Sequence, residues 1–471
     1  MSIQPVTQAQ LFGRLPPEYP RSLLPDIQAR VVAGQRTLVV LDDDPTGTQT
    51  VYDLPVLTEW SSPALQHELA RGAPIFYILT NSRSLPLLEA QALNAAVARN
   101  LLAASRAAGR DFAVVSRSDS TLRGHYPGEV DALTAALGQS VDATLIIPFF
   151  LEGGRHTVDD VHYVAEGDRM VPAGDTPFAR DAVFGYQSSN LRDWVAEKTG
   201  GRVRAEQVAA ISIQDLRIGG PTAVQEKLAA LRDGRVCIVN CAGMRDMEVF
   251  VCGLLDAEAA GKRFVYRTAA SFVQVRAGLA SRPTLGRADL RLPASGGGLF
   301  VVGSYVPRTT SQVAALLEQT HIDRVEVDVA ALLDAGRRQG EVTRAAAAVD
   351  DALVHARDVV VYTSRTLVTG ADAAANLAIG QQVSASLIAV VHGLQQTPRY
   401  VVAKGGITAS DVATQGLGIR RAQVLGQVLP GVPVWRTGPE SRYPGLVYVV
   451  FPGNVGDANA LVDVQRKLRP D

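Results

Sequence analysis

Three consecutive aspartates follow a short apolar run, and they constrain the fold of this chain more than any other feature. The run at 37–41 is rich in β-branched residues, which predicts a buried strand. Asp42, Asp43 and Asp44 come directly after it, and a Pro-Thr-Gly turn follows. In a parallel α/β sheet, ligands bind just beyond the carboxyl ends of the strands. We therefore expect the three carboxylates to lie at a ligand site of such a sheet.

A polar turn or a helix cap is the alternative for these aspartates, because Asp is common in both. One aspartate would satisfy a turn. Three adjacent carboxylates repel one another and raise one another's pKa, or they share a cation. This repulsion favours a functional site over a plain turn.

Length and composition indicate a globular chain with two domains. At 471 residues the chain exceeds the usual size of one hydrophobic core. Apolar residues make up 47% and the net charge is −1, so no basic excess indicates nucleic acid. No apolar run reaches membrane-spanning length, and the N-terminus lacks the apolar core of a signal peptide. Cys237, Cys241 and Cys252 lack the partners of a zinc site, so we expect reduced core thiols in a cytoplasmic protein.

Apolar runs and helical patterns alternate along the chain. The predicted strands are 37–41, 55–58, 74–80, 111–115, 143–147, 235–240, 263–267, 299–302, 358–362, 400–403 and 446–451. Helical patterns between them include one that begins at Pro86 and one over 127–137, and polar clusters repeatedly follow the strand ends. This alternation predicts an α/β protein in which each domain has a mainly parallel sheet flanked by helices.

Enrichment in Pro and Gly at 282–298 marks the best domain boundary. We predict an irregular lead-in at 1–35, a first α/β domain at 36–281, a linker at 282–298 and a second α/β domain at 299–471. Residues 150–230 are less regular than the rest of the first domain.

The loop after the predicted strand 111–115 carries Arg117, Asp119, Ser120 and Arg123. Arginine suits a two-pronged grip on a carboxylate or a phosphate. An ordinary surface Arg–Asp pair is the alternative, but the position after a strand favours a ligand site.

A second loop, E-G-G-R-H-T at 152–157, has glycines that let backbone approach a ligand and also carries Arg155. A plain Gly-Gly turn is equally compatible with these residues. His125, His156 and His162 lack metal-ligand spacing, so we expect structural histidines.

Three Gly-rich turns follow strands in the second half, at 303–310, 404–408 and 452–456. Such turns offer free N–H groups at a helix N-terminus, which suit an anion. Each turn alone is as compatible with a plain connection, but three on separate α/β units suggest a nucleotide. The chain has neither the P-loop motif G-x-x-x-x-G-K-[ST] nor a G-x-G-x-x-G that opens a strand–helix unit.

With these motifs in this order, the chain resembles the four-carbon acid sugar kinase family over nearly its whole length. The matching elements are D-D-x-T-G at 43–47, D-S-T-L-R-G at 119–124, P-x-F-x-E-x-G-R at 148–155, G-S at 303–304, G-G-x-T at 405–408 and G-N-x-G at 453–456. D-S-T-L-R-G within this ordering is specific, whereas the glycine pairs alone are not.

The resemblance implies an N-terminal domain that binds a sugar acid, a C-terminal domain that binds ATP, and a reaction in the interdomain cleft. It implies a sugar-acid site of Asp43, Asp44, Arg117 and Asp119, which we extend to Ser120, Arg123 and Arg155. It implies an ATP site of Ser304, Gly405, Gly406, Thr408 and Gly453, which we extend to Ile407 and Asn454. Pro45, Thr48-Gln49-Thr50, Ile407 and the segment 175–190 depart from the family pattern, and they leave the individual substrate open.

As a mechanism, we expect Asp44 or Asp43 to orient the attacking hydroxyl and accept its proton. Arg117, with Arg155 as second choice, would grip the substrate carboxylate, and Mg²⁺ would bridge phosphate oxygens without a predicted protein ligand. The expected partner is a small acid sugar rather than a nucleic acid or a membrane, and the oligomeric state, a homo-oligomer included, stays open.

Two other functions compete with the kinase hypothesis. Asp42-x-Asp44-x-Thr46 also spells the D-x-D-x-T signature of haloacid-dehalogenase-type phosphatases, in which the first Asp would be the nucleophile. That alternative leaves the C-terminal half unexplained. A non-catalytic sugar-acid sensor would need no nucleotide site.

Overall fold

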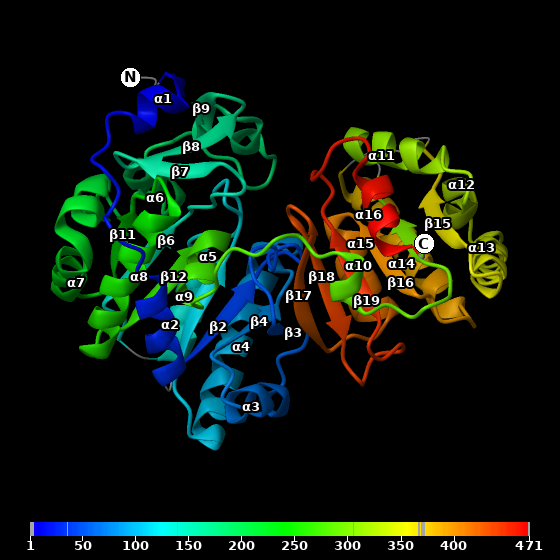
Figure 1. Ribbon diagram of the computed structural model, residues 1–471, viewed down its shortest axis with the longest axis horizontal. Coiled ribbons are helices and arrows are strands. Elements are labelled where there is room, and N and C mark those ends of the chain that lie inside the picture. Colours follow the sequence, from blue (N-terminus) through cyan, green and yellow to red (C-terminus); the bar gives the residue numbers. More distant parts are fainter. Residues whose placement is uncertain are drawn as a thin grey trace. The chain divides into compact units, whose positions relative to one another are not determined.

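The computed structural model describes residues 4–34, 36–138, 140–304, 306–365, 368 and 373–469. The chain divides into two compact units. The first consists of Met1–Gly47 with Glu59–Ser281, and the second of Thr48–Thr58 with Arg282–Asp471. Each unit is built of alternating strands and helices (Figure 1).

The first unit is built on a parallel sheet of buried, β-branched strands. Its strands lie in the order β10 (Ala209–Ile211), β11 (Arg235–Val239), β6 (Ala143–Ile147), β12 (Phe264–Thr268), β5 (Phe112–Arg117), β2 (Thr37–Asp42) and β4 (Ile75–Leu79). Every neighbouring pair in this series is parallel. The strands predicted for this half before and after the irregular region are thus confirmed within one or two residues.

Helices of the first unit fall into two packed groups. One group has α3 (Ser62–Ala70), α4 (Leu87–Ala108) and α5 (Gly128–Leu137), and the other has α2 (Leu24–Ala33), α7 (Gly220–Ala230), α8 (Met244–Ala259) and α9 (Ala270–Arg276). The described part of the lead-in is therefore not irregular, because Ile27 of α2 is buried and α2 packs against α8 and α9.

Within the irregular region 150–230, residues 155–172 join the start of the lead-in in a second, antiparallel sheet of four strands. Its order is β1 (Val6–Thr7), β9 (Arg169–Pro172), β8 (Val161–Glu166) and β7 (Arg155–Val158). The short helices α1 (Gln8–Phe12) and α6 (Leu191–Lys198) complete this part of the unit. Its strands are too short and too interrupted by turns to give a clear period in the sequence.

The order of the main strands reverses beside β2. The chain runs from β2 to β4 on one side and returns to β5 on the other side of β2. Such a reversal opens a crevice at the carboxyl ends of the two strands, and this is the usual ligand position in an open α/β sheet. Here the crevice lies after Asp42 and Arg117, the last residues of β2 and β5.

The second unit has a mixed sheet. Its order is β3 (Leu54–Leu57), β17 (Arg421–Leu429), β18 (Val432–Thr437), β19 (Val447–Phe451), β16 (Tyr400–Lys404), β13 (Leu299–Val302), β15 (Asp358–Thr363) and β14 (Ile322–Val327). The strands from β19 to β14 are parallel, whereas β3, β17, β18 and β19 pair antiparallel. The order reverses between β13 and β16, which gives this unit its own crevice.

The helices of the second unit are α10 (Arg287–Leu290), α11 (Pro307–Leu317), α12 (Val329–Leu333), α13 (Arg338–Val354), α14 (Ala373–Gly393), α15 (Gly406–Asp411) and α16 (Ala460–Leu468). Val313, Leu316, Leu461, Val464 and Leu468 are buried in one core cluster with the sheet, as their helical spacing predicts. No helix among the described residues is long and apolar enough to span a membrane.

Two segments belong to the second unit although the sequence prediction placed them elsewhere. Residues 48–58 follow the acidic loop, but β3 pairs with β17 (Figure 1). The Trp435 indole also donates to Thr48 Oγ1 at 3.0 Å. The expected linker at 282–298 carries α10, and its Leu285 and Leu290 are buried in the core of this unit. The stretch is rich in Pro and Gly, so its composition suggested a linker. The apolar side chains within it nevertheless pack into the core.

Candidate active site

The acidic loop after β2 is largely buried at the crevice of the first unit. Asp42 and Asp43 are only 1% and 3% exposed, and Asp44 is partly exposed. Gly47 has to be a glycine, since a Cβ there would lie 1.9 Å from an Asp42 carboxylate oxygen. The loop therefore folds tightly over the first aspartate.

Asp42 and Arg117 form a buried pair across the neighbouring strands β2 and β5. Arg117 Nη1 lies 3.4 Å from Asp42 Oδ1, and Arg117 is 5% exposed. Burial raises the pKa of Asp42 to about 8, against the opposing effect of the Arg117 charge. Through this contact, Asp42 and Arg117 connect the carboxyl ends of β2 and β5.

Arg83 connects the two loops of the crevice. It follows β4 in the 3₁₀ turn Ser82–Ser84, forms an ion pair with Asp44 and lies 3.8 Å from Asp119. Burial alone would raise the pKa of Asp44, but Arg83 and then the Thr46 hydroxyl outweigh it and lower the pKa. Asp44 is thus an ionised carboxylate with both oxygens engaged.

Asp43 keeps one oxygen without a partner. Its Oδ2 accepts a hydrogen bond from Ser118 Oγ at 2.5 Å, and its buried Oδ1 has none among the described residues. A buried carboxylate oxygen left unpaired is costly, so a water or a ligand is expected to satisfy it.

Two further arginines lie around the ring of Phe178. The guanidinium carbons of Arg123 and Arg155 lie 5.1 and 5.6 Å from the ring centroid. Arg123 is engaged by Asp119 at 2.8 Å and by Asp181 at 3.6 Å. Within the described part of the chain, Arg155 has no carboxylate partner, and its Nε is buried without an acceptor.

Sequence reasoning missed Arg267, Arg83 and Ser118 as members of this cluster. Arg267 is 1% exposed, and it donates to the Asp119 carbonyl at 3.0 Å and to Ser118 Oγ at 3.2 Å. Arg267 could have been found from the sequence as a charged residue near the end of a buried strand, since it is the fourth residue of β12. The signal for Arg83 was the polar N-S-R that follows β4.

His125, His156 and His162 have separate structural partners, as expected. His162 Nε2 contacts the Ser120 carbonyl at 2.8 Å, His156 Nδ1 the Ala242 carbonyl at 3.0 Å and His125 Nε2 the Leu85 carbonyl at 2.9 Å. Burial lowers the pKa of His162 to about 3, so this ring is neutral.

The crevice of the second unit is surrounded by the three Gly-rich turns. Gly405 has φ +112° and precedes α15, and a Cβ on it would lie 3.1 Å from Ser304 Cβ. A Cβ on Gly303 would lie 2.6 Å from Thr408 Oγ1. Thr309 Oγ1 approaches both Ser304 Oγ, at 3.2 Å, and the Gly453 carbonyl, at 3.4 Å. The structure thus brings together Ser304, Gly405, Thr408 and Gly453, while Ile407 and Asn454 are exposed and Gly406 is half-buried beside them.

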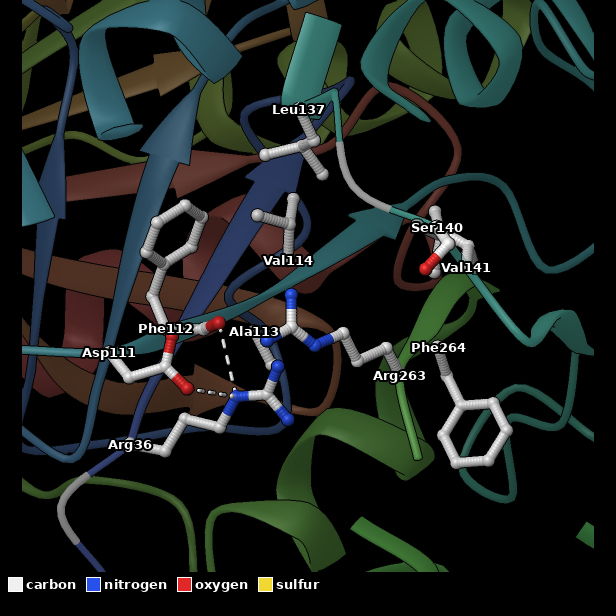
Figure 2. Close-up of a pocket in the computed structure, with 11 residues that line it drawn as sticks. Arg36, Asp111, Phe112, Ala113, Val114, Leu137, Ser140, Val141, Arg263 and Phe264 are labelled. Atoms are coloured by element: carbon white, nitrogen blue, oxygen red, sulfur yellow. Dashed lines mark hydrogen bonds and ion pairs between the residues drawn. The ribbon is translucent and has the colours of Figure 1, made fainter. Parts of the chain in front are cut away.

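A cavity of about 40 Å³ lies at the other end of the first sheet. Phe112 and Phe264, the first residues of β5 and β12, line it together with Arg36 and Arg263 (Figure 2). Arg36 is already engaged there by Asp111 at 3.3 Å and by the Phe112 carbonyl at 3.1 Å. No residue predicted for the site lines this cavity.

Known proteins match both halves of the chain. A model of sugar-binding N-terminal domains matches residues 38–276, and a model of nucleotide-binding C-terminal domains matches residues 299–461. A protein of Salmonella typhimurium has the same fold, with a TM-score of 0.66 and 21% identity over 92% of this chain and all of that one. The chain is thus a two-domain α/β protein with a sugar-binding and a nucleotide-binding half.

Curated relatives narrow this class to a family. A 3-oxo-tetronate kinase of Cupriavidus necator is 30% identical over 414 residues, which are 84% of this chain and 87% of the relative. A D-erythronate kinase of Heliobacterium modesticaldum is 27% identical over 327 residues, 67% and 68% of the two chains. A D-threonate kinase of C. necator is 27% identical over 383 residues, 78% and 82% of the two chains. The chain belongs to the four-carbon acid sugar kinase family.

Proposed function

We propose that this protein is an ATP-dependent kinase that phosphorylates a hydroxyl group of a tetronate or 3-oxo-tetronate. The observation that carries the proposal is the set of arginines and aspartates at the β2–β5 crevice of the sugar-binding half. Charged groups of both signs suit a substrate that has a carboxylate at one end and a hydroxyl to be deprotonated at the other.

The contacts within the cluster favour Arg155 for the substrate carboxylate. Arg83, Arg117 and Arg123 each face an aspartate, whereas Arg155 has no carboxylate partner in the described part of the chain. Arg155 is also partly exposed, and the Phe178 ring places it near Arg123. We propose that Arg155 and Arg123 grip the carboxylate, while Arg117 supports the acidic loop through Asp42.

Asp43 is the preferred base in this proposal. Its unpartnered Oδ1 is able to accept the proton of the attacking hydroxyl. Asp44 has both oxygens engaged, so it anchors Arg83. Asp119 anchors Arg83 and Arg123 together. Since phosphoryl transfer passes through a loose transition state, positioning of this kind accounts for most of the catalysis.

ATP is proposed to bind at the second crevice through backbone N–H groups of the turns that carry Ser304, Gly405, Gly406 and Gly453. The side chains of Ser304 and Thr408 line the same turns.

Kinase chemistry also implies Mg²⁺. Among the described residues, no three His, Cys, Asp or Glu side chains form a group that could hold a metal. Mg²⁺ in kinase sites usually keeps several waters and takes one or two carboxylates together with the phosphates, and Mg²⁺ bound to the ATP phosphates would neutralise their charge.

The phosphatase alternative is weakened by the position of Asp42. A nucleophile needs a free carboxylate oxygen that can reach the phosphorus atom, and the Asp42 carboxyl is paired with Arg117. A screen of tetronates and 3-oxo-tetronates that follows ADP release tests the proposed function. We expect ADP release that depends on one or more of these acids, and its absence with every acid would reject the proposal.

A further inference from the structure

Lys404 connects two of the Gly-rich turns of the second unit. It is the last residue of β16, directly before Gly405, and it is fully buried. Its ammonium donates to the carbonyls of Pro452 at 2.6 Å and Gly453 at 3.2 Å, in the loop after the neighbouring strand β19. Lys404 therefore couples the Gly405 turn to the 452–457 loop.

Side chains also hold the remaining carbonyls of the 452–457 loop. These donors come from the first turns of α11. Arg308 Nη1 donates to the carbonyls of Asn454 at 3.0 Å and Gly456 at 3.4 Å, and Gln312 Nε2 donates to those of Val455 at 3.0 Å and Asp457 at 2.8 Å. All six consecutive carbonyls of the loop thus accept hydrogen bonds from side chains.

This arrangement fixes the direction of the N–H groups in the loop. In a trans peptide the C=O and the following N–H point in opposite directions. Because the loop carbonyls face Lys404 and α11, the N–H groups of the loop point away from Lys404 and α11. Within the described residues, the N–H groups of Gly453, Asn454 and Gly456 have no protein acceptor. Successive free N–H groups of this kind form a binding site for an anion.

The charge of Lys404 is balanced by carbonyl dipoles rather than by a carboxylate. Its ammonium lies 4.1 Å from the centroid of the Phe451 ring, and it has no ion-pair partner in the described part of the chain. Burial, and then the charge of Arg308, lower the pKa of Lys404 to about 7. The adjacent β13 and β19 carry no charged residue, Tyr448 being their one titratable group, and Asp411 of α15 is bonded to Ser384. An anion in the loop would therefore favour the protonated lysine.

We propose that Lys404 and Gln312 are positioning residues of the nucleotide site, which hold the 452–457 loop with its N–H groups facing the phosphates. This inference rests on the proposed ATP-dependent function. It predicts that nucleotide binding and protonation of Lys404 are coupled, whereas a purely structural lysine would show no such coupling.

Calorimetric titration of the full chain with ADP at pH 8, in two buffers of different ionisation enthalpy, tests this inference. A phosphate monoester has its second ionisation near pH 6, so proton uptake at pH 8 reports on the protein. From a pKa of about 7, we expect the wild type to take up roughly 0.5 to 0.9 proton per ADP. Lys404→Met should abolish this uptake and weaken ADP binding about 10- to 100-fold. Gln312→Met should weaken binding about 10-fold while keeping the uptake.

The matched control is Gln339→Met, an exposed glutamine of the same unit, which should bind ADP like the wild type. Arg308→Ala, at an exposed position, serves as the second variant if the buried changes prevent folding, and it should weaken ADP binding several-fold. A wild type that does not bind ADP would reject the proposed function. A wild type that binds ADP without proton uptake, or loop variants that bind like Gln339→Met, would overturn the inference while leaving the proposed function in place.

Discussion

Asp42 Oδ1 lies 3.4 Å from Arg117 Nη1, and this buried pair closes the carboxyl ends of the two strands that border the crevice. Both residues lie in motifs for which the sequence predicted a ligand site. We propose that both support the acidic loop, since neither side chain is more than 5% exposed. In the proposed function, the chemistry then depends on Asp43, Asp44 and the arginines around them.

The stability conferred by Asp42 should depend on pH. The pKa of Asp42 is about 8 in the folded chain and about 3.9 in the unfolded chain, so between these values the folded state holds the extra proton. Stability therefore falls as the pH rises through this window. Asp42→Asn lacks this effect, and its free energy of unfolding relative to wild type should increase from pH 5 to pH 8. Urea denaturation at both pH values measures it, and a pH-independent difference would contradict the raised pKa.

Arg155→Lys should weaken sugar-acid binding. Lysine keeps the charge but loses the planar fork that grips a carboxylate. We expect the KM for the sugar acid to rise about 10- to 100-fold, with the KM for ATP nearly unchanged. Arg202→Lys is the matched control, because Arg202 is an exposed arginine of the same unit. An unaltered sugar-acid KM in Arg155→Lys would move the carboxylate site elsewhere, with Arg83 as the next candidate.

Asp43→Asn and Asp44→Asn should have different effects. Loss of the proposed base Asp43 should lower kcat about 10²- to 10⁴-fold. Loss of the Asp44 charge should release Arg83 and raise the sugar-acid KM more than it lowers kcat. Steady-state kinetics with both substrates separate these outcomes, and Asp131→Asn on the exposed surface of α5 is the control. A full kcat in Asp43→Asn would exclude Asp43 as the base.

A C-terminal fragment should need the 282–298 segment to fold. A fragment of residues 296–471 removes Leu285 and Leu290 from the core, which costs about 2–5 kcal/mol for each large side chain lost. We expect a fragment of residues 282–471 to be measurably more stable to urea than 296–471. Equal stability of the two fragments would show that α10 adds nothing to the second unit.

The sequence predicted those parts of the fold that a local pattern specifies. The fully buried strands before the crevices, such as Phe112–Arg117 and Tyr400–Lys404, are short apolar runs that end in polar residues. The hairpin of β17 and β18 was missed, although Arg421–Leu429 alternates between half-buried and buried residues. The pairing of β3 with β17 joins segments far apart in the chain, which no local pattern specifies.

The candidate site was predictable in its loops but not in its pairings. Residue types after the strands marked Asp43, Asp44 and, as second choice, Arg155 as candidate site residues. Which arginine faces which aspartate depends on strand order, and that order places β5 rather than β12 beside β2. The pairing of Arg117 with Asp42 follows only from this order.

The central claim is tested most directly by following ATP-dependent phosphorylation and phosphate-ester hydrolysis side by side in the wild type, Asp42→Asn and Asp43→Asn. We predict that the wild type transfers phosphate from ATP to a tetronate or 3-oxo-tetronate, that Asp42→Asn keeps part of this activity, and that Asp43→Asn loses nearly all of it. Hydrolysis of phosphate esters that needs no ATP and vanishes in Asp42→Asn would instead identify Asp42 as a phosphatase nucleophile and contradict the kinase account.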